Sequence, residues 1–188
     1  MIDELREYHF TPDAWHTYWA LFQDLCLPIR RDDYGVLLGL WHEQVGDTVY
    51  FRHLWRYDSL DARAQLRGEL IKLDAWRNEF LPQAGAQVSR QCLQVLNPRG
   101  AIGLQSLALA RYLHLYRCPT GKAAALIEQL GTVAQRARHS LCGVWATEFS
   151  DPNQVVVMTA RPDAPALDLH PGTAIQTHRL QPLGVAPR

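Results

Sequence analysis

Three charged or titratable side chains in the first third of the chain could carry acid–base chemistry. Glu4 and Arg6 lie two positions apart, and residues at that spacing share one face of a β-strand. His53 lies among large aromatic residues in a second strand-like segment. An arginine can bind a carboxylate, phenolate or enolate, and a histidine exchanges protons near neutral pH. We predict Glu4, Arg6 and His53 as catalytic residues, with Arg6 and a tyrosine stabilising an oxyanion and His53 moving a proton.

Aromatic residues gather on the predicted strand faces of both halves of the chain. Together with a few polar groups, aromatic side chains line pockets for planar, partly apolar ligands. We expect such a ligand to be a small aromatic or conjugated metabolite. The predicted substrate-binding residues are Tyr8, Trp41, Glu43, Phe51, Trp55, Tyr57, His114, Tyr116 and Trp145.

Each candidate also has a purely structural interpretation. His53 on a half-buried strand can be a hydrogen-bonded packing residue, and Glu4 with Arg6 can form an ordinary ion pair within a sheet. Glu43 can be a solvated hairpin residue, and aromatic side chains often only fill a core. The orientation of the strand decides between these interpretations, because His53 can act on a ligand only if its face lines a cavity.

No spacing in the sequence marks a metal or nucleotide site. His53, His114 and Glu43 would form a two-histidine, one-carboxylate set if they converged, but they fall on three separate predicted strands. The chain contains no G-x-S-x-G nucleophile elbow, no P-loop and no dinucleotide-binding glycine pattern. We therefore predict no bound metal and no organic cofactor.

The composition is that of a globular protein, with 47% hydrophobic and 20% charged residues. The 19 basic and 19 acidic residues balance, so no net field attracts nucleic acid or an anionic membrane. No apolar run approaches membrane-spanning length, and the N-terminus lacks the apolar core of a signal peptide. Four cysteines without a C-x-x-C pair indicate free thiols, so we predict a cytoplasmic protein.

Hydrophobic patterning predicts a ferredoxin-like order in the first half. Residues 2–10 alternate as a strand that leads into a helix with one apolar stripe. Residues 34–57 form two strands joined by a tight turn, and a second helix follows Asp58 or Ser59. Residues 91–98 are a last strand that ends at a proline. The resulting order is β-α-β-β-α-β.

The second half repeats this order incompletely. Trp41 and Asp47 align with Trp145 and Asp151 at a fixed offset across two strands and a hairpin, which indicates internal duplication. A proline-rich loop replaces the second helix of this half before a final strand.

The predicted fold class is α+β. The first ferredoxin-like half covers residues 2–99, the degenerate second half covers residues 107–184, and residues 100–105 are the linker. Two such halves can bury their open sheet faces against one another as an α+β barrel, with the helices outside and a central cavity. The sequence leaves open whether two chains pair further as a homodimer.

The segments "ELREYHFTPDAW", "GVLLGLWHEQVGD" and "HLWRYDSLDAR" resemble the NIPSNAP family. The resemblance is close over residues 2–82 and weaker over residues 107–160. It implies the fold of the dimeric α+β barrel superfamily, which also contains cofactor-independent monooxygenases. The degenerate second half departs from that pattern and makes the expected pocket asymmetric.

Two classes of function follow. The first is an enzyme that acts without a cofactor on a small metabolite through an oxyanion, by oxygenation, isomerisation or rearrangement. The second is a non-catalytic protein that binds a metabolite or interacts with other proteins through its outer helices.

Overall fold

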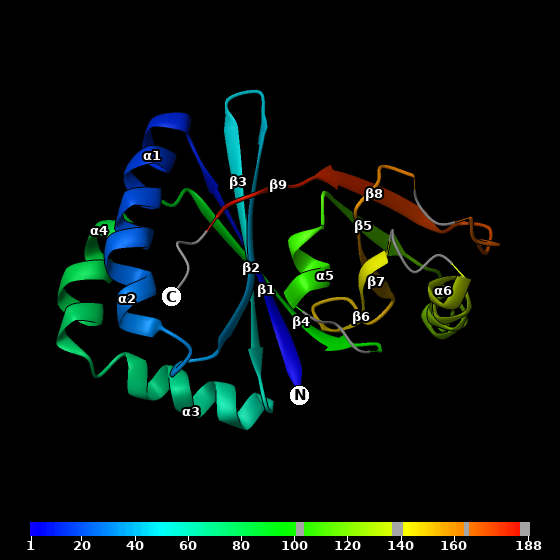
Figure 1. Ribbon diagram of the computed structural model, residues 1–188, viewed down its shortest axis with the longest axis horizontal. Coiled ribbons are helices and arrows are strands. Elements are labelled where there is room, and N and C mark those ends of the chain that lie inside the picture. Colours follow the sequence, from blue (N-terminus) through cyan, green and yellow to red (C-terminus); the bar gives the residue numbers. More distant parts are fainter. Residues whose placement is uncertain (101–103, 137–140, 164–165, 185–188) are drawn as a thin grey trace. The chain divides into compact units, whose positions relative to one another are not determined.

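The computed structural model describes residues 1–100, 104–136, 141–163 and 166–184 and confirms the predicted α+β fold class (Figure 1). The chain divides into two compact units, here called unit 1 (Met1–Leu93, with the segment from Leu183) and unit 2 (Gln94–Pro182). Each unit contains its own antiparallel strands and helices. No helix in the described ranges combines the length and apolar character needed to cross a membrane. The sheet-against-sheet packing of the halves stays a prediction.

The division falls inside strand β4 (Arg90–Pro98) and not at the linker expected over residues 100–105. The reason is that β4 serves both units. Its first residues follow Ser89, whose N–H donates to the carbonyl of His9 in unit 1. Its last residues pair with strand β6 (Leu141–Phe149) of unit 2. Of the expected linker, residues 101–103 lie outside the described residues, and helix α5 (Leu104–Ala108) begins directly after them.

Unit 1 has the predicted β-α-β-β-α-β order with strand order β4-β1-β3-β2. The caps follow the sequence: Thr11 Oγ1 accepts a hydrogen bond from the N–H of Ala14, and Ser59 Oγ accepts one from Ala62. Its remaining elements are β1 (Ile2–Phe10), α1 (Pro12–Leu21), η1 (Phe22–Cys26), α2 (Leu27–Arg30), β2 (Val36–Val45), β3 (Thr48–Tyr57), α3 (Leu60–Leu70), η2 (Ala75–Phe80) and α4 (Leu81–Gly85).

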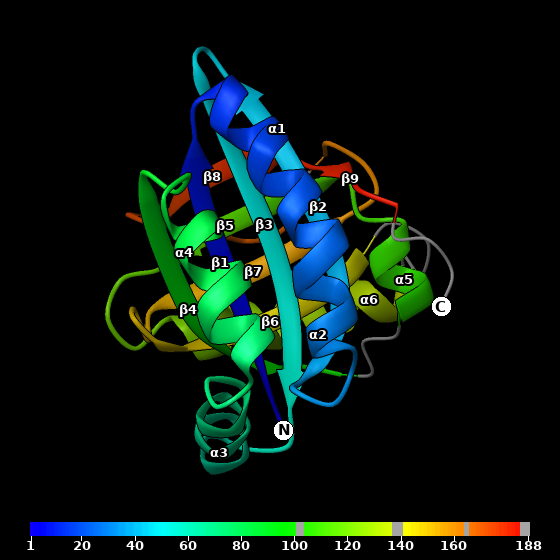
Figure 2. The same cartoon turned by 90° about the vertical axis from the view of Figure 1, so that its left-hand side faces the viewer.

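The helices of unit 1 cover one face of its sheet, as Figure 2 shows for α1, α2 and α4 in front of β1 and β3. Arg6 lies opposite His53 in the antiparallel register of β1 and β3, and Tyr8 lies opposite Phe51. Directly opposed residues point to the same side of a sheet. The Phe51 ring contacts Trp15 of α1 at 5.2 Å between ring centroids, so these four residues all face the helices.

Two continuous helical segments of unit 1, α1-η1-α2 and η2-α4, are here called its helical arms. Each arm contains a π-helical turn just before a proline. The N–H of Leu27 bonds to the carbonyl of Phe22, and that of Leu81 bonds to Trp76, each five residues back. Pro28 and Pro82 follow these turns directly and have no N–H for an α-helical bond. The wide turns, η1 and η2, therefore let each helix continue past its proline.

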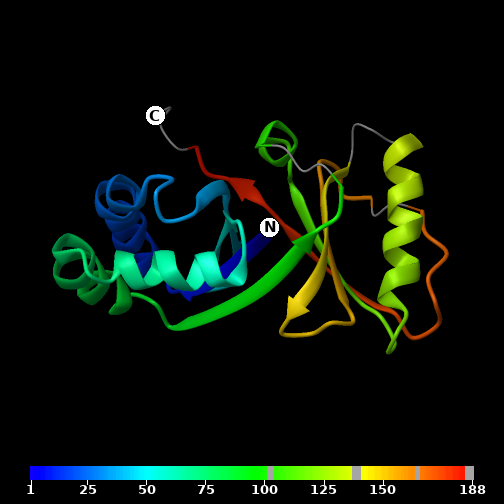
Figure 3. The same cartoon turned by 90° about the horizontal axis from the view of Figure 1, so that it is seen from below.

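Unit 2 repeats the same topology in the strand order β8-β5-β7-β6. Helix α6 (yellow-green in Figure 3) lies along its strands and packs Leu126 and Leu130 against Tyr116. Between β7 and β8 no helix occurs in the described residues, and Leu167 and Leu169 of the loop pack on that cluster instead. Its elements are α5, β5 (Tyr112–Arg117), α6 (Ala123–Arg136), β6, β7 (Gln154–Thr159), β8 (Ala174–Arg179) and β9 (Gln181–Pro182).

A Gly-x-Trp motif on the second strand of each unit reports the duplication at atomic detail. A Cβ added at Gly39 would lie 2.2 Å from the indole of Trp41, and one at Gly143 would lie 2.2 Å from the indole of Trp145. Both indoles therefore fold flat over the glycine two positions earlier. A register shift accompanies the glycine in both strands.

Replacing Gly39 with alanine should destabilise the protein, because the new methyl group would overlap the fully buried Trp41 ring. We expect the free energy of unfolding to fall by about 1–3 kcal/mol, as for overpacked cores. The matched control is Gly131→Ala in α6, where the added methyl meets open space and helix propensity should give a gain of about 0.5–1 kcal/mol. Urea denaturation of both variants measures the difference, and equal stabilities would contradict the interpretation.

Candidate functional site

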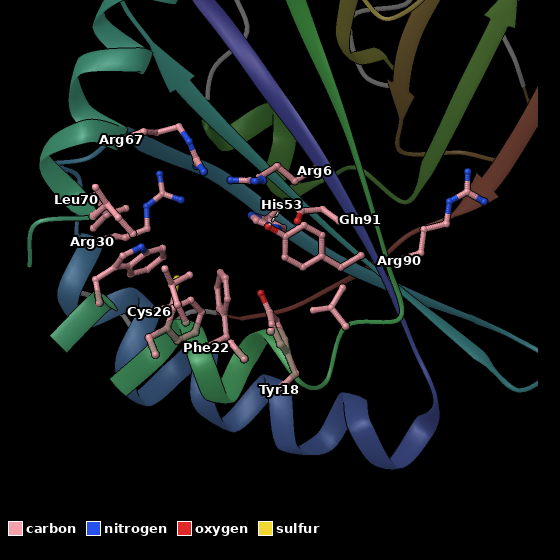
Figure 4. A pocket seen from close by; sticks show the side chains of 18 of the residues that line it. Arg6, Tyr18, Phe22, Cys26, Arg30, His53, Arg67, Leu70, Arg90 and Gln91 are labelled. Atoms are coloured by element: carbon pink, nitrogen blue, oxygen red, sulfur yellow. Dashed lines mark hydrogen bonds between the residues drawn. The ribbon is translucent and has the colours of Figure 1, made fainter. Parts of the chain in front are cut away.

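A cavity of about 640 Å³ lies in unit 1 between the helix-covered face of the sheet and the helical arms. Figure 4 shows side chains from β1, β3 and the helices pointing into it. Its wall is largely apolar and aromatic, while its polar groups are mostly cationic. The apolar wall includes Tyr18, Phe22, Leu70, Trp76, Phe80 and Leu81, and the polar side chains include Arg6, Tyr8, Arg30, His53, Arg67, Arg90 and Gln91.

The π-helical turns shape this wall. Phe22 and Cys26 come from η1, and Trp76 and Phe80 come from η2. A π turn rotates the residues after it relative to an α-helix and is frequent at functional sites. Here both turns direct side chains at the same cavity from two different helical arms.

Arg30 carries a buried charge into the cavity wall. Its side chain is 2% exposed, and its guanidinium stacks over the Trp55 ring at 3.4 Å from the centroid. It donates hydrogen bonds to the carbonyl of Tyr34 at 2.6 Å and to the Tyr57 hydroxyl at 3.0 Å. Both acceptors are neutral, and its Nε is buried without a hydrogen-bond partner. Within the described residues, Arg30 therefore has no carboxylate partner.

Among the described residues, Arg6 pairs with one carboxylate, that of Glu4, and shares it with a second arginine. Its Nη1 lies 3.3 Å from Glu4 Oε1, while Arg63 pairs with Oε2 of the same carboxylate. Burial lowers the pKa of Arg6, but electrostatic interactions with neighbours, chiefly Tyr8 and Glu4, have the larger combined effect and raise this pKa above its ordinary value. The Nε of Arg6 is buried and has no hydrogen-bond partner. Arg6 thus stays charged with donor capacity to spare.

Arg67 adds a third cation to the same space (Figure 4). Burial and the neighbouring charge of Arg6 lower the pKa of Arg67. Among the described residues that line the cavity, none has an acidic side chain. Three arginines with one nearby carboxylate, shared and fully buried beside the cavity, make this space electropositive.

His53 enters the cavity as a neutral hydrogen-bond donor. Trp55 Nε1–H can only donate, and it lies 2.6 Å from His53 Nδ1, so Nδ1 must accept. The proton of the neutral ring is therefore on Nε2, which is buried without a hydrogen-bond partner. Burial and the neighbouring arginines lower the pKa of His53 well below its ordinary value. The predicted proton transfer by His53 does not fit this geometry, because its one lone pair is already used.

Two tyrosines complete the polar part of the wall. Burial raises the pKa of Tyr8, and burial together with Tyr8 raises that of Tyr18 further. Both therefore keep their hydroxyl protons at neutral pH. Tyr8 accepts a hydrogen bond from Gln91 Nε2 at 2.9 Å, which leaves its own O–H free to donate.

The structure brings together only part of the predicted site. Arg6, Tyr8 and His53 line the cavity. Glu4 lies beside Arg6 but not in the lining. Three further predicted residues share the face of His53 but do not line the cavity: Phe51, Trp55 and Tyr57. Trp55 donates a hydrogen bond to His53, and Tyr57 accepts one from Arg30, so both help to position the lining residues.

Trp41 and Glu43 lie on the other face of the sheet, which corrects the expectation that they share a pocket with His53. Glu43 pairs with Arg52, a residue opposite Glu7 in the register, and Arg52 also pairs with Glu7. His53 and Arg52 are successive residues of one strand and point to opposite faces. A metal set of His53, His114 and Glu43 is therefore not formed.

His114, Tyr116 and Trp145 belong to unit 2 and serve its packing. Both ring nitrogens of His114 lie 2.9 Å from threonine hydroxyls, those of Thr177 and Thr159. Tyr116 is buried in the apolar cluster under α6, and burial raises its pKa to about 12. Trp145 covers Gly143.

Sequence analysis missed Arg30 and Arg67. A signal for Arg30 was present, because Phe22, Cys26 and Arg30 follow one another at four-residue spacing and so continue the apolar stripe of the first helix. A charged residue at the end of a buried stripe indicates a buried charge. Arg67 similarly lies three positions before the buried Leu70 of α3.

Comparisons with known proteins place this cavity in a recognised domain. The NIPSNAP family model matches residues 3–100, which include every residue of the cavity wall. A NIPSNAP domain protein from Burkholderia xenovorans is 28% identical over 53% of this chain and 96% of its own, with a TM-score of 0.46. A comparison with curated proteins finds no match.

Two solved structures match nearly the whole chain. A putative monooxygenase from Fusobacterium nucleatum has a TM-score of 0.62 and 10% identity, covering 97% of this chain and 92% of its own. A putative monooxygenase from Lactobacillus acidophilus has a TM-score of 0.55 and 11% identity, covering 97% and 99%. At this identity the likeness concerns the fold alone.

The lowered pKa of His53 predicts a pH dependence of stability. As the pH falls below 6.5 the unfolded chain protonates this ring before the folded protein does, because burial and the neighbouring arginines lower the pKa of His53 in the folded state, so acid favours unfolding. The free energy of unfolding should fall with decreasing pH, with His53 contributing up to about 1.4 kcal/mol per pH unit.

His53→Asn should remove this one-proton contribution, since asparagine can still accept from Trp55 but does not titrate. His16→Asn, at an exposed position of α1, serves as the control. Urea denaturation at a series of pH values measures the slopes. Equal slopes for His53→Asn and wild type would refute the assignment, as would an NMR titration of folded His53 near pH 6.5.

Proposed function

Because the chain belongs to the NIPSNAP family, we propose that its unit 1 cavity binds a small aromatic or conjugated organic anion and stabilises its oxyanion for cofactor-independent chemistry. The apolar wall takes the body of the ligand, and the arginines take its charged group. The reaction class is an oxygenation, isomerisation or rearrangement that passes through an enolate or phenolate.

The buried charge of Arg30 carries this proposal. An arginine removed from water without a counter-ion loses solvation that neutral acceptors and one aromatic ring replace only in part. A bound anion would supply the missing charge. The oxyanion of such a ligand could accept hydrogen bonds from three buried donors that have no partner, namely Arg6 Nε, Arg30 Nε and His53 Nε2–H.

The protonation states of these wall residues also determine in which ionic form the substrate must bind. The cavity wall contains no carboxylate, its tyrosines keep their protons, and the free nitrogen of His53 already carries one. We therefore propose a substrate that is acidic enough to bind as its anion, such as a carboxylic acid, an acidic phenol or a 1,3-dicarbonyl. Catalysis then consists of holding the oxyanion in a largely dry, positively charged site.

The lack of a general base in the wall equally supports a second function, a non-catalytic binder of the same class of anion. Binding alone needs the arginines and the apolar wall but no proton transfer. Incubating the protein with a bound enolisable ligand under air and under argon separates the two functions. A change in the mass, chromatographic retention or NMR spectrum of the ligand in either gas indicates an enzyme, and a ligand unchanged by all three measurements in both gases indicates a binder.

Arg30→Met should weaken anion binding while leaving the fold intact. Methionine fills much of the arginine volume, and removal of an uncompensated buried charge is neutral or stabilising. Loss of a charge-assisted hydrogen bond of about 1.5–3 kcal/mol should weaken binding about 10–100-fold. The probe is 2-naphthoate, with 2-naphthamide as its neutral isostere, measured by thermal shift and calorimetry.

Arg77→Gln is the matched control, because Arg77 is an exposed arginine of η2 that does not line the cavity. The naphthoate should stabilise wild type and Arg77→Gln, and the amide should not. Equal binding of acid and amide, or unchanged naphthoate binding by Arg30→Met, would refute the anion site. Native mass spectrometry of freshly purified protein provides an independent search for a retained acidic ligand.

A further inference from the structure

Three side chains with metal-binding atoms meet on the sheet face that points away from the cavity. Glu7 and His9 lie two positions apart on β1 and so share a face, and Cys92 lies on the neighbouring strand β4. One ligand atom from each lies within 4.8 Å of the other two. All three side chains are partly exposed, so an ion in solution could reach them.

The distances suit one ion. Zinc binds carboxylate oxygen and imidazole nitrogen at about 2.0–2.2 Å and thiolate sulfur at about 2.3 Å. Two atoms on one tetrahedral zinc ion therefore lie about 3.3–3.6 Å apart. Glu7 Oε1 and His9 Nε2 are 2.8 Å apart, joined by a hydrogen bond, and Cys92 Sγ lies within 4.8 Å of both, so small side-chain rotations bring the three atoms to this separation.

The surroundings orient these ligands. Arg52 Nε donates to Glu7 Oε2 at 2.6 Å, which fixes the carboxylate while its Oε1 faces His9. The His9 ring packs edge-on against Tyr50 at 4.6 Å between centroids.

We propose that Glu7, His9 and Cys92 form a binding site for a zinc-like divalent metal ion, with a fourth position open to water or another ligand. The carboxylate, imidazole and thiolate donors are those that zinc accepts, and three protein ligands with one open position are the arrangement of reactive zinc sites. This site is separate from the cavity, because its ligands point to the opposite face of the same sheet.

Cobalt(II) substitution tests the site in the full chain, after reduction and removal of metal with a chelator. Thiolate ligation of cobalt gives a sulfur-to-metal charge-transfer band in the near ultraviolet, which neither histidine nor glutamate produces. We expect one equivalent of cobalt to generate this band and zinc to displace it. A chromophoric chelator in competition with zinc then gives the affinity.

Cys92→Ser should abolish the band, and His9→Gln should weaken zinc binding at least about tenfold. Cys118→Ser and His42→Gln are matched controls, since these residues lie in unit 2 and on the helix-covered face of unit 1, and both should bind metal as wild type does. Circular dichroism verifies that each variant is folded.

Absence of the band in wild type, cobalt binding without it, or its persistence in Cys92→Ser would each overturn the proposal. In those cases the contact between Glu7 and His9 is a structural hydrogen bond within the strand. Naphthoate binding by Cys92→Ser should match wild type, so the outcome is independent of the cavity's proposed function.

Discussion

The arrangement of unit 1 depends on keeping the Arg30 guanidinium in an aromatic, nearly dry environment. Trp55 supports the flat face of that cation, and the same indole donates to His53, so one ring fixes both polar groups. Tyr57, from the end of the same strand, holds the guanidinium from its edge. Three alternate residues of β3, His53, Trp55 and Tyr57, therefore form or support the electropositive wall. The cost of this buried charge explains why the surrounding side chains are so specific in their hydrogen bonds.

The helical arms leave a space between themselves and the sheet, and this space is the cavity. Pro28 and Pro82 each interrupt a helix at the level of the cavity, and each is preceded by a π-helical turn. The turns bring Phe22 and Trp76 to the wall from opposite arms. Since both prolines follow a leucine in the sequence, the two arms use the same local device.

The sequence predicted the order of elements along the chain, the helix caps and the alternation of faces well, because these depend on local periodicity and on the residues next to each helix start. The family resemblance was confirmed by the match over residues 3–100. The direction of the His53 face could not be predicted, since alternation shows which residues share a face but not what covers it. The helices cover it, yet a cavity remains there, so neither of the two alternatives for His53 was complete.

Other features depend on long-range register and were out of reach. Cys92 approaches Glu7 and His9 only through the pairing of the first and last strands of unit 1, which lie more than eighty residues apart in the chain. The tautomer of His53 follows from a contact with Trp55 that spacing allows but does not require. The unit boundary within β4 likewise follows from pairing with β6 and not from composition.

The degenerate second unit has a consequence for stoichiometry. At the position that corresponds to Arg6, its first strand carries His114, whose two nitrogens are already occupied by Thr159 and Thr177. A loop takes the place of the helical arm that supplies Trp76 and Phe80 in unit 1. In the described part of the chain the arginine-lined cavity thus occurs once, although both units have the same topology. Saturation of that cavity would follow a simple hyperbola, without the cooperativity that two equivalent sites in one chain could develop.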